Sequence, residues 1–411
     1  MKDSVDDRPL GSAYSVPRLG AIRWSLLFGN FAIGCGVMVV PGSLNDLTRS
    51  LQVSVALGGQ LITVAAAVIA FGAPLLAAAV GGWDRRRLLS FALAWYAVGH
   101  ALSALMPNYA LLTPVRALCM LGAAVFTPQA AAVIGALAAP EQRGRAITFV
   151  FLGWSVASVF GLPLHSYIGE TFGWRYAFAL VALLAAGGAA WVWSVLPDGV
   201  RPPELSLRAW KEVFTHPVLM AIVLVTALSG AGQFTVFTYF APYYSQVFGA
   251  GATEISLLFA WFGAFGLLGN VLLTRHIDRV GAERAVALLL ALVALSLLLW
   301  PIARNAVTMA LVIVPWALGC FASNSAQQAR LGLAAPALSP ALMALNTSAI
   351  YLGQAIGAAG GGAIVAASQL AAPSGARDAF GPIHWVGLAW LLMALALSMW
   401  AAQRMRRSKG V

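Results

Sequence analysis

The sequence predicts an all-α membrane protein with twelve transmembrane helices, arranged as two pseudo-symmetric halves of six helices each. The chain of 411 residues is 60% hydrophobic and 9% charged, with a mean hydropathy of +0.83. Soluble domains carry about 25% charged residues, so a chain this apolar belongs in lipid. Its apolar residues form about twelve runs near the ~20-residue length that crosses a bilayer. One polar, proline-containing segment, 197–216, separates six runs from the other six.

Each apolar run is predicted to be a helix, because backbone polar groups cannot stay unpaired in hydrocarbon and the alternating pattern of a membrane barrel is absent. The first bundle, 22–196, has spans at 22–42, 56–80, 88–106, 110–138, 147–170 and 175–196. The second bundle, 217–402, has spans at 217–247, 254–274, 285–302, 306–333, 340–367 and 383–402. The remaining predicted segments are a tail over 1–21, the linker over 197–216 and a basic tail over 403–411.

The basic residues predict the orientation in the membrane. Most of the 25 Lys and Arg residues fall in the tails and in alternate loops on the side of both termini. Cytoplasmic loops are enriched in Lys and Arg, so both termini are expected in the cytoplasm. The first 21 residues are polar and lack the pattern of a secretory signal. We expect a monomeric, multi-pass protein of the bacterial inner membrane, in contact with the lipid bilayer.

Several other classes of function find no support in the residue pattern. The net charge of +11 comes from clusters between apolar runs, without the interleaved aromatics of a nucleic-acid surface. The three cysteines and five histidines are dispersed, and no HExxH or CxxC spacing occurs, so no metal site is expected. A phosphate-binding Gly-x-x-x-x-Gly-Lys loop is absent as well. The sequence therefore predicts neither an enzyme nor a bound cofactor.

The fourteen acidic residues can all be placed in loops, tails or span ends. Carboxylates inside the membrane commonly carry the protons of proton-driven transporters, so the usual proton carrier is missing. A bulky cation would also find no deep counter-ion. We therefore expect a neutral or anionic small-molecule substrate.

Two related loops suggest that the two halves are repeats. The loop after the second span reads GGWDRRRLL, and the loop after the eighth reads RHIDRVGAER. These loops resemble the signature of the major facilitator superfamily, and the resemblance extends to its drug and sugar efflux branch of arabinose-efflux-like permeases. It implies gating or structural roles for Asp84, Arg85 and Arg86 in the first copy and for Asp278, Arg279 and Gly281 in the second. The family's aspartate position falls on Gly81. Arg85, Arg86 and Arg87 could equally be cytoplasmic anchors.

Arg116 lies inside the fourth span and precedes Gly122, Ala123 and Ala124, as in the family pattern. A charge in an apolar helix costs roughly 2.5–3.5 kcal/mol even on the lenient insertion scale. The resemblance implies that Arg116 takes part in proton coupling or binds an anionic group. The alternative is that its side chain extends to the outer surface, about two turns away.

The fifth span contains Gly161-Leu162-Pro163, which resembles the efflux-branch signature of that helix. Glycine allows close helix approach and proline removes a backbone donor, so a bend is expected at Gly161 and Pro163. His165 stands where the branch usually has glycine. It could titrate near neutral pH and carry protons, or it could simply bond to a neighbouring helix.

The seventh span reads SGAGQFTVFTYFAPYYSQVFG, which is typical of the arabinose-efflux-like branch. The fold implies that the first, fourth, seventh and tenth helices line a central cavity. Gln327, Gln328 and Arg330, at the end of the tenth span, are expected to face cytoplasmic water. Polar and aromatic mid-span residues are candidates for the cavity, although buried amides also bridge helices: Asn30, Gln129, Gln233, Phe237, Tyr239, Trp316, Asn324 and Gln354.

We therefore predict a secondary active transporter that exports a drug, sugar or metabolite in exchange for protons by alternating access. The candidates for proton coupling are Arg116, His165, Glu170 and His100. Arg116 and His165 are expected to form a pair in the outer half of the membrane, with Glu170 or the substrate supplying the negative charge. The alternatives are a facilitator without ion coupling and a membrane receptor or lipid-handling protein on the same fold.

Overall fold

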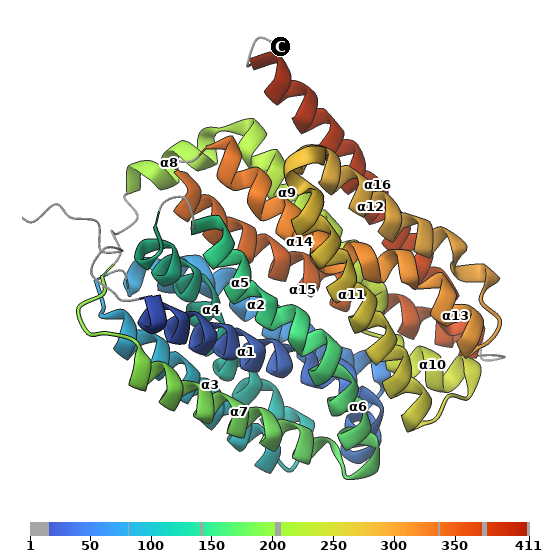
Figure 1. Ribbon diagram of the computed structural model, residues 1–411. Helices are drawn as coiled ribbons and strands as arrows, with labels where there is room; N and C mark the ends of the chain where they lie inside the picture. The colour runs from blue at the N-terminus through green and yellow to red at the C-terminus, as the bar shows by residue number, and fades with distance from the viewer. Residues whose placement is uncertain are drawn as a thin grey trace, which may run out of the picture.

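The computed structural model describes residues 16–80, 82–139, 143–201, 207–335, 338–371 and 376–408. Within these ranges the chain forms a bundle of long helices (Figure 1). One end of the bundle carries α8 (Leu207–Thr215) and the end of α16 (Ala376–Ser408), and is called the terminal end here. The other end carries α6 (Leu162–Thr171), α10 (Phe240–Phe248) and α13 (Ala306–Val312), and is called the far end.

The described residues of the first half form seven α-helices and one π-helix. These are α1 (Val16–Leu51), α2 (Val55–Ala79), α3 (Arg85–Leu105), α4 (Tyr109–Leu137), α5 (Arg143–Val156), the π-helix η3 (Ala157–Gly161), α6 and α7 (Trp174–Val195). The chain continues through α8, α9 (Pro217–Phe237), α10, α11 (Ala252–Val280), α12 (Ala282–Leu299), the 3₁₀ turn η4 (Trp300–Ile302), α13, α14 (Val314–Ala334), α15 (Ser339–Ala371) and α16.

The predicted spans are confirmed in the described residues. Eleven helices are long and apolar enough to cross a membrane, and the pair α13 and α14, bent by 40°, supplies a twelfth. The predicted linker, 197–216, contains a helix, α8. Its Trp210 and Phe214 rings stack with centroids 6.1 Å apart, and Val213 is fully buried. The predicted tail is also partly helical, since α16 continues to Ser408.

The two halves meet along two seams. On one, α2 lies against α15, and on the other, η3 and α6 lie against α11 (Figure 1). Within the second half, α9 packs closely on α15. A Cβ atom at Gly353 would overlap the carbonyl oxygen of Ala227, and one at Gly357 would overlap that of Ala231. Glycines in α15 therefore allow the close approach that small residues give helices in membranes.

A buried serine stabilises the break between α13 and α14. The Ser296 hydroxyl of α12 donates to the Val312 carbonyl at 2.6 Å and accepts from the Trp316 backbone N–H at 2.9 Å. Pro315 lies at the start of α14 and has no N–H to continue the ladder. The serine thus satisfies backbone groups that the break would otherwise leave unpaired in hydrocarbon.

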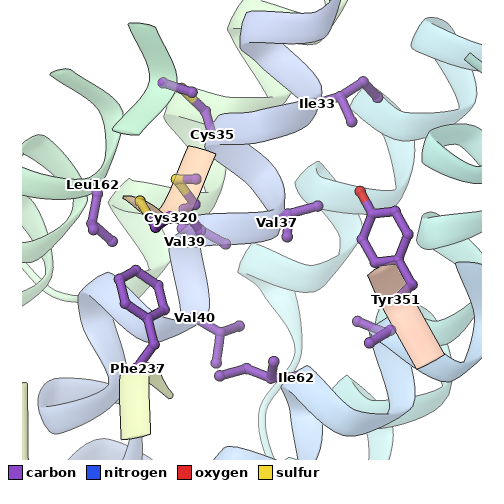
Figure 2. Packing of buried hydrophobic residues seen from close by; sticks show 14 of the residues in the cluster. Ile33, Cys35, Val37, Val39, Val40, Ile62, Leu162, Phe237, Cys320 and Tyr351 are labelled. Carbon is purple, nitrogen blue, oxygen red and sulfur yellow. The ribbon is translucent and has the colours of Figure 1, made fainter. Parts of the chain in front are cut away.

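The largest hydrophobic core is continuous between the halves. It includes Val37 and Val40 of α1, Ile62 of α2, Phe237 of α9 and Tyr351 of α15. Figure 2 shows these side chains in one cluster around α1. Some of these core residues, Val37, Phe237 and Tyr351, also line the cavity described below.

Candidate functional site

A cavity lies between the two halves, bounded by α1, α4 and α5 on one side and by α9, α11, α14 and α15 on the other. It contains about 1220 Å³ of empty space, counting the part that opens to solvent. Along α14 its wall runs from Trp316 to Gln328, which at 1.5 Å per residue is roughly 18 Å. The cavity therefore extends along the helix axis from the far half of the molecule toward the terminal end.

The cavity wall is aromatic and apolar, with uncharged polar groups among the rings. None of its lining side chains, all within the described residues, is charged. Such a surface suits a ligand that is largely apolar and has a few hydrogen-bonding groups. The aromatic lining residues are Phe151, Trp154, Phe234, Phe237, Phe262, Trp316, Phe321 and Tyr351. The amide and hydroxyl residues are Thr127, Ser155, Thr226, Gln233, Asn270, Asn324, Ser325, Gln328, Thr347 and Gln354, together with the Tyr351 hydroxyl.

The structure places five of the eight predicted cavity residues on this wall: Gln233, Phe237, Trp316, Asn324 and Gln354. Gln233 and Trp316 hold each other in place. The Trp316 indole N–H donates to Gln233 Oε1 at 3.0 Å, and Gln233 Nε2 donates to the Ser229 hydroxyl at 3.0 Å. This fixes the tryptophan ring at the far end of the cavity.

The other three predicted cavity residues, Asn30, Gln129 and Tyr239, do not line it. Asn30 bridges helices, since its Nδ2 donates to the Val150 carbonyl at 3.3 Å and its Oδ1 accepts from the Thr127 hydroxyl at 2.9 Å. The Tyr239 hydroxyl donates to the Ala358 carbonyl at 2.7 Å. Gln129 is 7% exposed and lies outside the cavity wall.

Arg116 is also away from the cavity, inside the first half. Its guanidinium donates to the Gly36 carbonyl at 2.8 Å and to His100 Nε2 at 3.3 Å, and it lies 5.4 Å from the centre of the Phe178 ring. Only 1% of the side chain's surface is exposed, so it does not extend to the membrane surface. Arg116 thus connects α4 to α1, α3 and α7.

The contact with Arg116 determines the protonation of His100. Arginine can only donate, so His100 Nε2 accepts and carries no proton. Its Nδ1 lies 2.9 Å from the Tyr96 carbonyl, which can only accept, so the proton is on Nδ1. His100 is therefore neutral in this arrangement.

His165 forms no hydrogen bond with either of its expected partners, Arg116 and Glu170. His165 is fully buried in α6 near Gly42 of α1, and neither ring nitrogen has a hydrogen-bond partner. Glu170 instead pairs with Arg49, at 3.2 Å between carboxylate and guanidinium. Another carboxylate at the far end, Asp46, accepts from the Trp174 backbone N–H at 2.8 Å and holds α7 to α1.

The first signature loop attaches α3 to the end of α7. Asp84 caps α3 through the Arg87 N–H at 3.1 Å and accepts from the Gly199 N–H at 2.6 Å. Arg86 forms an ion pair with Asp198 at 2.8 Å. Arg85 is 3% exposed and donates to the Val80 carbonyl at 2.9 Å. These contacts lie within the first half and do not join it to the second.

The second signature loop lies between α11 and α12. The side chain of Asp278 lies outside the described part of the chain, and Arg279 occupies the last turn of α11. Gly281 has a φ of +83°, a conformation that favours glycine, and so allows the sharp turn into α12. Nearby, Glu283 of α12 pairs with Arg406 of α16 at 3.5 Å.

The segment around Gly161 and Pro163, where a bend was expected, is helical throughout and forms a contact between the halves. A Cβ at Gly161 would lie 2.6 Å from Cys35 Sγ, so glycine brings the helix close to α1. The π-helix η3 ends at Gly161, and the Pro163 carbonyl accepts from the Ser256 hydroxyl of α11 at 3.2 Å. This segment thus joins the first half to the second at the far end.

The expectation that Gln327 and Arg330 face water is wrong. Arg330 is 2% exposed, and it donates to the Ser398 hydroxyl at 2.9 Å and the Ser398 carbonyl at 3.1 Å. Gln327 is 3% exposed and donates to the Ile222 carbonyl at 2.9 Å. The helix α14 continues to Ala334, which leaves Arg330 one turn inside the bundle with acceptors on α16.

Several cavity residues were not found from the sequence. They are Trp154 and Ser155 on α5, Asn270 on α11 and Tyr351 on α15. Asn270 is a single amide within an apolar run, the same signal that identified Gln233. The fold implied that the first, fourth, seventh and tenth helices line the cavity, whereas Asn270 lies on the eighth span, α11, which also contributes to the wall.

The sequence profile of the Major Facilitator Superfamily matches residues 26–358. The inner membrane transport protein YdhP of Escherichia coli K12 is 28% identical over 343 residues, covering 84% of this chain and 88% of that protein. A chloramphenicol resistance protein of Streptomyces lividans is 32% identical over 372 residues, covering 89% and 92%. Among solved structures, a bacterial homologue of the human lysosomal transporter Spinster superposes with a TM-score of 0.74 at 17% identity, covering 95% and 98%.

Proposed function

The chain belongs to the major facilitator superfamily, and on this premise we propose that it exports a small, uncharged amphipathic molecule by alternating access. The observation that carries the proposal is the cavity wall, in which aromatic rings alternate with amides and hydroxyls and no lining side chain is charged. A ligand with a net charge would have to lose water there without gaining a counter-charge. A neutral molecule with an apolar body avoids that penalty.

An anionic substrate is less well supported than a neutral one. An anion would need a buried cation as its partner. Arg116 and Arg330 are buried, but neither lines the cavity. Both already donate to groups of the protein, Arg116 to Gly36 and Arg330 to Ser398. We therefore narrow the expected substrate from neutral or anionic to neutral.

Contacts between the halves support alternating access with the far end closed. Asn45 of α1 donates to the Ala241 carbonyl of α10 at 3.4 Å, and Ser256 donates to Pro163 at 3.2 Å. A Cβ at Gly263 of α11 would lie 2.6 Å from the Ser158 carbonyl oxygen. In our proposal these contacts separate when the cavity opens toward the far end. The terminal end is then the cytoplasmic side of the bacterial inner membrane, and a monomer is the working unit.

The Streptomyces relative suggests a first compound to test. It is named a chloramphenicol resistance protein, and it is 32% identical to this chain. Chloramphenicol is uncharged and has an aromatic ring, hydroxyl groups and an amide. These features match a wall of rings, amides and hydroxyls, so we take chloramphenicol as a candidate substrate.

For proton exchange we propose His165 as the site. It is a titratable group in α6 without hydrogen-bond partners on either ring nitrogen, and it lies beside α1 near the closed far end. The Ser256 hydroxyl crosses from the second half to Pro163, two residues away. Opening of the far end would separate this contact and give water access to His165, which could then exchange a proton.

Reconstitution into liposomes tests the function. We expect chloramphenicol flux in one direction to drive protons in the other, reported by a pH-sensitive dye inside the vesicles. His165→Leu should abolish the proton movement. His276→Leu changes an exposed histidine at the other end of the bundle and should behave as the unmodified protein. Proton movement that persists in His165→Leu would contradict the coupling role, and absence of flux for a panel of neutral amphiphiles would contradict the function.

An uncoupled facilitator is the second candidate, favoured by one observation. The cavity has no carboxylate among its lining residues, and carboxylates are common proton carriers in driven transporters. In that case substrate would move only down its own gradient. Equal flux with and without a proton gradient, with no proton counterflow, would select this candidate.

A further inference from the structure

The amide of Asn270 lies on the cavity wall with one of its polar atoms unpaired. Its Nδ2 donates to the Ser155 hydroxyl at 3.2 Å, whereas its Oδ1 has no hydrogen-bond partner. The residue is 6% exposed, so bulk water does not satisfy this oxygen. A buried acceptor without a partner is unfavourable, and in a binding cavity it is a natural place for a ligand donor.

The position of Asn270 is fixed by tight packing of α11 on both sides. On one side, a Cβ at Gly263 would lie 2.6 Å from the Ser158 carbonyl oxygen of η3. On the other side, a Cβ at Gly269 would overlap the Leu318 carbonyl oxygen of α14. The helix therefore has little freedom to move the amide away, and the unpaired oxygen remains at the wall.

Two other buried amides of the second half, Gln233 and Gln327, already have partners. Gln233 uses both ends of its amide, on Trp316 and on Ser229. Gln327 donates to the Ile222 carbonyl and to the Thr226 hydroxyl. Asn270 differs because its bond leads to Ser155 of the first half, while its acceptor is unused.

We propose that Asn270 is the specificity-determining acceptor of the cavity, and that it recognises a hydroxyl or amide N–H of an uncharged amphipathic substrate. The inference rests on the proposed function and adds the residue and the group that is recognised. Because Nδ2 of the same amide bonds to Ser155, a ligand held by Oδ1 is connected to both halves at once. The Asn270–Ser155 bond thus links occupancy of the cavity to the approach of the halves.

The test measures binding of tritiated chloramphenicol to the full chain in lipid nanodiscs, alongside transport in liposomes. Asn270→Leu removes the acceptor and keeps the number and branching of the side-chain heavy atoms, and Asn270→Asp keeps an acceptor at the same place. Ser155→Ala removes the link to the first half and leaves the acceptor. Gln129→Leu is the matched control, since it removes a largely buried amide outside the cavity. Asn270→Ala is a second variant in case Asn270→Leu does not fold. Thermal unfolding checks that each variant is folded.

We expect Asn270→Leu to bind at least tenfold more weakly, which corresponds to about 1.4 kcal/mol. The affinity of Asn270→Asp should stay within about threefold of that of the unmodified protein, because an acceptor for the ligand's donor is retained. The affinity of Ser155→Ala should stay within about threefold of that of the unmodified protein, because the acceptor remains. Its transport should be at least fivefold slower, because the link between the halves is lost. Gln129→Leu should match the unmodified protein in both assays.

Three results would overturn the inference. Asn270→Leu could bind as tightly as the unmodified protein, or it and Ser155→Ala could weaken binding equally, which would make Asn270 only a bridge between helices. The unmodified protein could also fail to bind the probe. Normal binding without any transport would contradict the proposed function but leave the recognition by Asn270 in place.

Discussion

At the scale of single residues, the charge of Arg116 is stabilised without a carboxylate. A backbone carbonyl, the neutral His100 and the face of Phe178 surround its guanidinium. Each provides electron density toward the cation, from lone pairs or from an aromatic ring. The arrangement connects four helices of the first half, so its first consequence is for stability rather than for the cavity.

Replacing Arg116 should therefore destabilise the protein. In Arg116→Ala the Gly36 carbonyl and His100 Nε2 lose their donor in a buried site, and we expect a loss of about 2–4 kcal/mol in the free energy of unfolding. Thermal unfolding in detergent measures the effect. Arg284→Ala removes an exposed arginine of α12 and should change stability by less than about 0.5 kcal/mol. Lost transport with unchanged stability in Arg116→Ala would instead indicate a direct role in transport.

At the scale of elements, the breaks in the helices position the cavity residues. The break between α13 and α14 sets the direction of Trp316, and Ser296 of α12 satisfies the backbone groups at this break. The break between α9 and α10 follows Phe237, another residue of the wall. At the break between α13 and α14 the interruption is tolerated in the membrane because a neighbouring side chain satisfies the backbone.

Ser296→Ala should therefore affect the cavity as well as stability. It leaves the Val312 carbonyl and the Trp316 N–H without their partner, and we expect a loss of about 1–3 kcal/mol. Thermal unfolding gives the stability, and the binding assay with tritiated chloramphenicol reports the position of Trp316. Ser194→Ala is the control, because that exposed hydroxyl bonds only to its own helix, at Trp191. Equal stability of the two variants would show that the break does not depend on Ser296.

At the scale of the whole molecule, the two halves touch at the far end and separate around the cavity. Besides the far-end contacts, Ser348 of α15 donates to the Ala70 carbonyl of α2, and Trp154 of α5 lies near Tyr351 of α15, with ring centroids 6.5 Å apart. The Ser348 contact lies on the seam between α2 and α15, whereas Trp154 and Tyr351 both belong to the cavity wall. Transport by alternating access requires the far-end contacts to break in each cycle.

Cross-linking the far end should therefore stop transport. Asn45 of α1 and Ser245 of α10 line the same groove at that end. In the variant with both Asn45→Cys and Ser245→Cys, a short bifunctional thiol reagent should reduce flux at least tenfold, and cleavage of the linker should restore it. The single variants, treated with the same reagent, should retain flux. Transport that continues in the cross-linked protein would contradict a cycle that opens the far end.

The sequence determined the spans, because the length and composition of each apolar run are local properties that decide whether a helix can cross a membrane. The family resemblance also held for the fold. Neither the composition of the runs nor the family resemblance could distinguish Gln233, which lines the cavity, from Asn30, which bridges helices. Both are single amides in apolar runs.

Only the tertiary structure decided which polar groups face the cavity and which are paired. Arg330 has acceptors 68 residues away on α16, and Asn270 meets Ser155 from the other half. The partner of a buried polar group depends on how helices rotate and pack, and packing depends on contacts between segments far apart in the chain. For this reason the sequence gives the membrane fold of this protein, whereas the chemistry of its cavity follows from the arrangement of the two halves.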